Sequence, residues 1–185
     1  MKSQLVNKRM KIVFSITFIV TILFLAQNVC AQSSCYCVNS HTEFNDAGVS
    51  KDWLGGNVYH YRDSVSIGEE TGDIIANFQM IEDGNINLNT FKTHFDGKLT
   101  LSDVTVRGLG DMSGDFKGNY QGSGLYTPEP FTLSWDVEYV THGSGDFKGM
   151  KLFQSCTGVN DGTGREDCEG FILDPHGTIP DVPCE

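Results

Sequence analysis

The sequence is poor in basic residues, with 13 lysines and arginines against 24 aspartates and glutamates in 185 residues. Proteins that bind nucleic acids use basic patches to neutralise phosphates, so this deficit argues against a nucleic-acid partner. The excess of acidic groups instead favours solubility and tolerates cations at the surface.

The chain also lacks the motifs of several common enzyme classes. It has no glycine-x-serine-x-glycine elbow and no phosphate-binding loop. It has no Asn-x-Ser/Thr acceptor for glycosylation, because Asn39-Ser40-His41 and Asn89-Thr90-Phe91 fail at the third position. Beyond the N-terminal segment, no stretch has helical periodicity. These absences predict an all-β protein, leave the catalytic residues unknown and imply no cofactor.

The N-terminus has the pattern of a secretory signal peptide. Four basic residues precede the apolar run Ile12–Leu25, which is too short to span a bilayer comfortably, and Val29-Cys30-Ala31 supplies small residues for cleavage. We expect a signal peptide over residues 1–31 and a secreted or periplasmic protein with no membrane contact after cleavage. The alternative is an uncleaved membrane anchor.

Cleavage after Ala31 would leave 154 residues, Gln32–Glu185, enough for one domain with a sizeable core. The removed segment holds four basic and no acidic residues, so 9 basic residues remain against 24 acidic ones, a net charge of −15. The remaining domain is therefore strongly acidic.

Five cysteines remain, and they lie near the two ends of the chain. An exported chain can keep disulfides, so we expect bridges that tie the termini together or onto the domain. The odd count leaves one thiol over, or one bridge between molecules. A zinc site is disfavoured because Cys35 and Cys37 are spaced too closely and the sequence has no second cysteine pair that could complete a set of four ligands. The disulfide candidates are Cys35, Cys37, Cys156, Cys168 and Cys184.

Alternating apolar and polar residues predict about eight strands. Phe131–Val140 is the clearest, with Phe131, Leu133, Trp135, Val137 and Tyr139 on one face. Many short strands separated by turn glycines predict an antiparallel β-barrel or a sandwich, and closure into a barrel would hide the sheet edges. We expect an irregular strap over 32–56, the barrel over 57–173 and an extended tail over 174–185.

Glycine-rich segments predict the breaks between these strands. We expect a loop at Gly68–Gly72, a turn at Asp83-Gly84 and another break at Asp96-Gly97. Val159–Glu169 is glycine-rich and acidic, which predicts a further loop.

A six-residue phrase occurs twice, as Ser113–Gly118 and Ser144–Gly149. Each copy reads Ser-Gly-Asp-Phe-Lys-Gly and stands between strand-like segments. Its glycines allow a sharp bend, and its phenylalanine has the character of a core residue. Two copies about thirty residues apart predict two corners of one curved sheet.

Together with other short motifs, this phrase resembles the allene oxide cyclase and dirigent barrel group. The matching segments are Tyr61-Arg62-Asp63, Ile67-Gly68 with Gly72, Phe95-Asp96-Gly97, Ser113–Gly122 and the second copy Ser144–Gly149. The resemblance implies an eight-stranded antiparallel barrel whose lumen holds one apolar ligand, and assembly as a trimer or dimer. The resemblance assigns no catalytic residue to a position of this sequence. A lipocalin barrel is the competing fold. The glycine-x-tryptophan motif of that family is absent here, because Lys51 and Asp52 precede Trp53.

Aromatic residues on the apolar strand faces are candidates to line a lumen. The alternative is a core filled by the same side chains without a cavity, which a barrel of about eight strands permits. The candidates are Tyr59, Tyr61, Phe78, Phe95, Phe131, Trp135 and Tyr139.

Polar clusters give weaker signals. Asp136 and Glu138 share a strand face opposite Trp135, so we expect them to face water rather than to form an acid–base pair. The five histidines are scattered, and Asp161–Asp167 lacks the alternating ligands of a calcium loop, so no metal site is predicted.

Three functions remain open. The first is a barrel that binds a small hydrophobic or aromatic molecule without catalysis. The second is an isomerase or cyclase that folds a reactive lipid or polyketide-like intermediate in the same lumen. The third is a surface interaction protein with a solid core. A cavity lined only by apolar groups favours the first, an ionisable residue deep in a cavity the second, and no cavity the third.

Overall fold

The structure is a computed structural model that describes residues 33–49, 51–129 and 131–184, so the predicted signal peptide lies outside the described residues. Within these ranges the chain forms nine strands and one helical turn. In order they are β1 (Ser34–Gly48), β2 (Lys51–Gly55), β3 (Val58–Gly72), β4 (Ile74–Asn87), β5 (Lys92–Val106), β6 (Gly114–Pro128), β7 (Phe131–Gly143), η1 (Gly145–Phe147), β8 (Lys151–Asn160) and β9 (Gly164–Asp174). No helix in the described part is long and apolar enough to cross a membrane.

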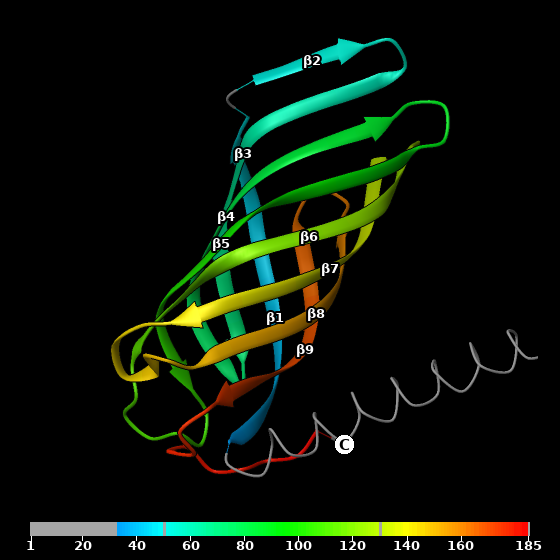
Figure 1. The fold of residues 1–185 in the computed structure, drawn as a ribbon. Coiled ribbons are helices and arrows are strands. Elements are labelled where there is room, and N and C mark those ends of the chain that lie inside the picture. The colour runs from blue at the N-terminus through cyan, green and yellow to red at the C-terminus, as the bar shows by residue number, and fades with distance from the viewer. Residues whose placement is uncertain (1–32, 50, 130, 185) are drawn as a thin grey trace, which may run out of the picture.

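Eight of these strands close into an antiparallel barrel. Each strand from β3 to β9 pairs with the next, and β1 pairs with both β9 and β3 to complete the ring. The ninth strand, β2, extends the sheet beyond β3 at the upper edge in Figure 1. The predicted all-β, eight-stranded barrel is confirmed.

The N-terminal segment differs from the predicted strap over 32–56. Ser34–Gly48 is a full barrel strand that is hydrogen-bonded on both sides. Its inward-facing residues alternate, but Ser40 and Thr42 stand between Val38 and Phe44. Because two of the four are polar, the strand lacks the apolar alternation that reveals a half-buried strand.

The predicted breaks at Gly68–Gly72, Asp83-Gly84 and Asp96-Gly97 are also wrong, because β3, β4 and β5 run through them. These glycines make room inside the barrel. A Cβ at Gly84 would lie 2.2 Å from the ring of Tyr61. Glycine in a strand interior therefore marks close approach of another group here, not a turn.

The inward side chains of the strands make one continuous core. On β4 the alternation is clean, with Ile74, Ala76, Phe78 and Met80 all buried. Both phenylalanines of the repeated phrase belong to the same core. Apolar burial on this scale is the main driving force for the fold.

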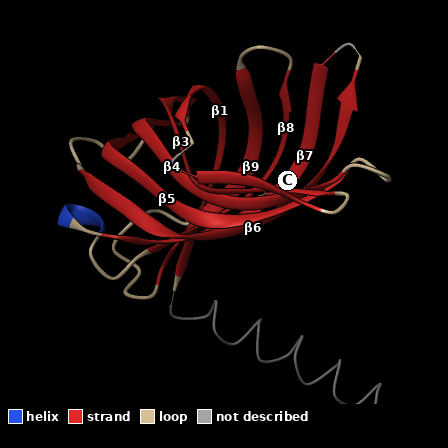
Figure 2. Ribbon diagram, turned by 90° about the horizontal axis from the view of Figure 1, so that it is seen from above, coloured by secondary structure: helices blue, strands red, loops and turns tan. Residues whose placement is uncertain are grey.

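The two copies of the repeated phrase lie against each other. The first opens β6, and the second forms η1, the helical turn drawn in blue in Figure 2. Phe116 and Phe147 are fully buried, with ring centroids 5.1 Å apart. The backbone N–H of Ser113 donates to Asp146 Oδ2 at 3.0 Å, and the N–H of Ser144 donates to the carbonyl of Asp115 at 2.8 Å. The first copy is therefore the start of a strand and not the predicted corner, and only the second copy forms a turn between two strands.

The C-terminal tail is fixed to β1. Val182 forms a parallel bridge with Tyr36, and the disulfide Cys37–Cys184 adds a covalent link. A second disulfide joins Cys156 on β8 to Cys168 on β9, while Cys35 forms no disulfide. The expected bridge between the two ends of the chain is confirmed by Cys37–Cys184, whereas Cys156–Cys168 joins two neighbouring strands of the barrel.

Candidate functional site

The lumen contains a cavity of about 310 Å³ toward the end of the barrel opposite the repeated phrase. Residues from β1, β3, β4, β5, β7, β8 and β9 contribute to its wall, so it lies within the ring of strands. The wall is mostly apolar and aromatic, with two carboxyl groups. The lining residues are Phe44, Val49, Tyr59, Tyr61, Ser64, Ser66, Met80, Glu82, Ile86, Phe95, Leu133, Trp135, Asn160 and Glu166.

Two larger depressions, of about 550 and 600 Å³, lie over β5, β6 and β7. Both include outward-facing polar side chains such as Asp96, Gln121 and Glu138. They belong to the outer surface of the barrel, and the smaller lumen cavity is the one with a largely apolar wall.

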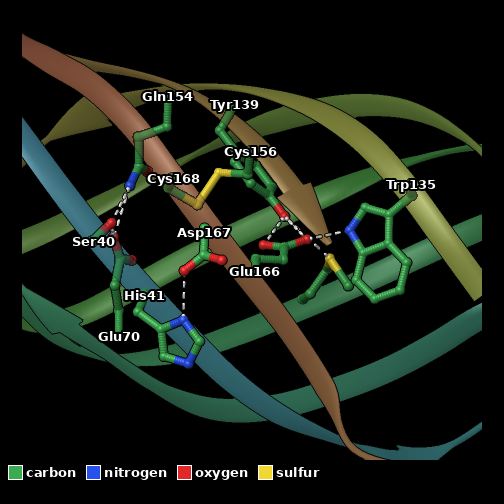
Figure 3. The surroundings of a disulfide bond; sticks show 11 residues. Ser40, His41, Glu70, Trp135, Tyr139, Gln154, Cys156, Glu166, Asp167 and Cys168 are labelled. Carbon is green, nitrogen blue, oxygen red and sulfur yellow. Dashed lines mark hydrogen bonds and ion pairs between the residues drawn. A yellow bond between two sulfur atoms is a disulfide. The ribbon is translucent and has the colours of Figure 1, made fainter. Parts of the chain in front are cut away.

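Glu166 is the most deeply buried acid of the cavity wall, with 1% of its surface exposed. The indole Nε1 of Trp135 donates to its Oε1 at 2.6 Å, and the hydroxyl of Tyr139 donates to its Oε2 at 2.8 Å. Figure 3 shows the carboxyl group held between these two side chains. The next residue, Asp167, faces the other way and contacts His41 at 2.9 Å.

The protonation of Glu166 follows from this setting. Burial raises the pKa of Glu166 to about 7, although the hydrogen bonds from Trp135 and Tyr139 lower it. The nearby carboxyl groups of Glu70 and Glu82 raise the pKa further. A carboxyl group that titrates near neutral pH can both donate and accept a proton, which is what acid–base chemistry needs.

Glu82 is the second acid of the wall and is half-buried. It accepts hydrogen bonds from the hydroxyls of Tyr61 at 2.5 Å and Tyr120 at 3.0 Å. Burial, and then the charge of Glu82, raise the pKa of both phenols. Both tyrosines therefore stay protonated at neutral pH and act as donors.

A third buried acid, Glu70, lies outside the cavity wall. Its Oε1 accepts hydrogen bonds from Ser40 Oγ at 2.6 Å and Gln154 Nε2 at 2.7 Å. Burial raises its pKa, and these two hydrogen bonds oppose the rise. Glu70 thus adds a further ionisable group near the lumen.

The disulfide Cys156–Cys168 lies beside Glu166 (Figure 3). One ligand-type atom from each of these three residues lies within 4.8 Å of the others, the spacing of a metal site. The disulfide uses both sulfur atoms, however, and only thiolates are effective ligands. The geometry with the bond formed therefore does not fit a metal ion.

Most of the aromatic lumen candidates face the interior. Four of the seven line the cavity: Tyr59, Tyr61, Phe95 and Trp135. Phe78 and Tyr139 are buried in the core and do not line the cavity. The ring of Phe78 stacks on that of Phe44, with 5.4 Å between the ring centroids. The side chain of Phe131 lies outside the described residues.

Sequence reasoning missed all three interior acids. Val159–Glu169 is not a loop, because β9 begins at Gly164 and turns Glu166 inward. A signal was present: if Cys168 bonds to Cys156 inside the barrel, Glu166 two residues earlier shares its face. The outward orientation of Asp136 and Glu138 is confirmed, as both are exposed.

No protein-family model matches this chain, and no curated protein matches its sequence significantly.

Proposed function

We propose that the chain is an exported β-barrel protein that binds a small hydrophobic or aromatic molecule in its lumen. The observation that carries this proposal is the cavity of about 310 Å³ with its largely apolar, aromatic wall. Small-molecule sites start at about 300 Å³ and combine apolar walls with a few polar groups, as this one does. The resemblance of the repeated phrase and its neighbours to the allene oxide cyclase and dirigent group supports the same use of the lumen.

Export is supported by the pattern of residues 1–31 and by the two disulfides, which persist in oxidising compartments. The mass of the protein isolated from its own host tests this part. A mature N-terminus at Gln32 supports export, and a retained leader contradicts it.

Ligand binding is tested in two steps. Native mass spectrometry of the protein purified without denaturation should reveal a co-purifying small molecule. After its removal, the protein should bind a neutral apolar fluorophore such as N-phenyl-1-naphthylamine. The variant Leu133→Trp, which enlarges a wall residue, should weaken this binding, whereas Ile81→Trp on the outer face should not.

A clean apo mass together with no uptake of the fluorophore would contradict the ligand-binding proposal. Equal weakening by the two tryptophan variants would place the probe outside the cavity and would also count against it.

A second candidate function is an isomerase or cyclase that works without a redox step. The position of Glu166 favours it, because this carboxyl group is buried in the wall of a real cavity and its pKa is raised to about 7. In this function the carboxyl group of Glu166 would act on the opening epoxide, as a hydrogen-bond donor to its oxygen or as a carboxylate beside the developing positive charge, and the aromatic wall would fold the substrate and exclude water.

The cyclase candidate is tested with an unsaturated allene oxide generated in the assay. Without a catalyst it cyclises to a racemic product, so chiral chromatography separates the two cases. An enantiomeric excess that is lost in Glu166→Gln and kept in Glu138→Gln would support catalysis in the lumen. A racemic product with the unmodified protein would contradict this activity.

A further inference from the structure

Strand β3 has a bulge beside the cavity. Two of its residues, Arg62 and Asp63, stand opposite one residue of β4, Asp83, so the register shifts between Tyr61 and Ser64. Asp63 has a φ of 50°, a conformation that residues other than glycine rarely adopt. An extra residue of this kind reverses the face that the following side chains take.

Specific contacts to β4 hold the bulge in place. The backbone N–H of Asp63 donates to Oδ1 of Asp83 at 2.9 Å. The guanidinium group of Arg62 donates to the carbonyl of Gly84 at 3.1 Å and lies 3.7 Å from the carboxylate of Asp83. Both bulge residues are therefore tied to the neighbouring strand, which fixes the register that follows.

The bulge turns two serines into the lumen and two aliphatic residues away from it. Regular alternation from Tyr61 would point Val65 and Ile67 inward. In the structure, however, Ile67 is 50% exposed, whereas Ser66 has 7% of its surface exposed and lines the cavity together with Ser64. Both changes oppose the hydrophobic effect. Local departures of this kind are expected at functional sites.

The hydroxyls of these two serines are uncommitted. Among the described residues, no group forms a hydrogen bond with the hydroxyl of Ser64 or Ser66. The larger polar groups of the wall do have partners. Glu82 and Glu166 accept from tyrosine and tryptophan side chains, and the hydroxyl of Tyr59 donates to an aspartate of β2 at 3.0 Å. The serines are therefore the polar groups of β3 that can serve a ligand.

A buried hydroxyl needs an acceptor for its hydrogen. A ligand that fills the cavity excludes water from Ser66, so it must offer an acceptor itself or leave the hydroxyl unsatisfied at a cost in free energy. Ser64 and Ser66 lie two positions apart on one face of β3. A carbonyl oxygen has two lone pairs and can accept from both. A ligand hydroxyl would add a further hydrogen that needs an acceptor in turn.

We propose that the ligand of the lumen is an uncharged apolar molecule with a carbonyl oxygen, which accepts hydrogen bonds from the hydroxyls of Ser66 and Ser64 while its hydrocarbon part contacts the aromatic wall. This inference rests on the proposed binding function and names the class of ligand. The cross-strand partner of Ser66 on β4 is Met80, so the serine lies in apolar surroundings. A charged group is disfavoured there because burying a charge in such surroundings is costly.

Two ligands of nearly the same shape isolate the oxygen atom. They are 1-acetylnaphthalene and 1-isopropenylnaphthalene, in which a methylene group replaces the carbonyl oxygen. Their affinities are measured by displacement of N-phenyl-1-naphthylamine. In Ser66→Ala the affinity for the ketone relative to that for the alkene should fall about fivefold, the factor for one net hydrogen bond. Ser64→Ala should lower the ratio as well. Ser134→Ala, which removes an exposed hydroxyl from the outer face of β7, should leave it unchanged.

Infrared spectroscopy reports the contact directly. With an isotope label in its carbonyl group, the bound ketone should absorb at lower frequency than it does in hexane, because a hydrogen bond weakens the carbonyl bond. In Ser66→Ala the band should move toward its position in hexane. This measurement separates a lost hydrogen bond from a change in packing, which alters the affinity alone.

The outcomes separate the two proposals. A ratio that Ser66→Ala leaves unchanged, or a band at its hexane position in the unmodified protein, would overturn the carbonyl inference and leave lumen binding intact. Tighter binding of 1-(1-naphthyl)ethanol than of the ketone would also overturn it, since the serines would then recognise a donor. The same holds if neither naphthalene compound displaces a bound fluorophore. No binding of either compound, together with no uptake of the fluorophore, would overturn both proposals.

Discussion

The indole Nε1 of Trp135 donates a hydrogen bond of 2.6 Å to Oε1 of Glu166. The tryptophan comes from β7 and the glutamate from β9, on either side of β8. Gly158 lies on β8 between them. It pairs with Trp135 of β7 on one side and with Glu166 of β9 on the other. Because glycine has no side chain, the indole can cross β8 and reach the acid.

The raised pKa of Glu166 predicts a dependence of stability on pH. In the unfolded chain this group titrates near 4.5, and in the folded protein at about 7. Between these values the folded state binds more protons than the unfolded one. The contribution of Glu166 to stability is therefore fully present below pH 4.5 and is lost as pH rises through 7, by about 3 kcal/mol in all.

The variant Glu166→Gln does not titrate and should escape this loss. Urea denaturation should be measured for both proteins at several pH values. The free energy of unfolding of the variant should rise relative to that of the unmodified protein as pH increases from about 4.5 to about 8. Glu138→Gln, on the exposed face, serves as the control. A difference between Glu166→Gln and the unmodified protein that stays constant with pH would mean that Glu166 has an ordinary pKa.

Substitution of Gly158 should disturb the site through packing. A Cβ at this position would lie 2.2 Å from Cε2 of Trp135. We expect Gly158→Ala to displace the indole, break its hydrogen bond to Glu166 and lower stability by about 1–3 kcal/mol. The emission of Trp135 in a Trp53→Phe background reports the displacement. Thr157→Ala, next to it and exposed, should leave both the emission and the stability unchanged.

The two phenylalanines of the repeated phrase should be coupled. Both are fully buried, so Phe116→Ala and Phe147→Ala should each cost about 3–5 kcal/mol. Because the rings contact each other, the double variant should cost about 0.5–1.5 kcal/mol less than the sum of the two single variants. Lys148→Ala, exposed in the second copy, is the control. Strict additivity would show that the two copies act independently.

Alkylation without reduction should distinguish the five cysteines beyond residue 31. Cys35 forms no disulfide and is half-buried, so peptide mapping of the unfolded, unreduced chain should find it alone modified. Cys35→Ser should change stability by less than about 0.5 kcal/mol. The double variant Cys37→Ser/Cys184→Ser opens a bridge across 147 positions and should cost up to about 5 kcal/mol. Modification of Cys37 or Cys184 in the unmodified protein would contradict this pairing.

The sequence predicted the class of fold because the core follows simple alternation. Strands such as β4 and β7 bury every second residue, and that pattern is visible without a structure. The strand that closes the ring, β1, was hidden because its interior includes Ser40 and Thr42. Local patterns carry no information about which distant strand a polar interior residue will face.

The candidate site was predicted less well, for a related reason. The aromatic wall residues follow from strand alternation, but nothing in the local sequence marks Glu82 as buried, and the inward position of Glu166 follows only if the bridge Cys156–Cys168 is assumed. Their donors come from three other strands, with the indole of Trp135 reaching from β7 and the hydroxyl of Tyr61 from β3. An acid becomes tolerable inside a protein only when such partners converge, and that is a property of the closed barrel.

The link between Cys37 and Cys184 makes the intervening chain a covalent ring that includes every strand from β2 to β9. A protease that cuts one surface turn, such as the exposed turn at residues 88–90, would open this ring without dividing it. Under oxidising conditions the two parts of the nicked protein would stay joined, with the mass of the intact protein plus one water, and they would separate into two fragments only after reduction. In an environment rich in proteases, a single cut therefore cannot release any strand from the barrel.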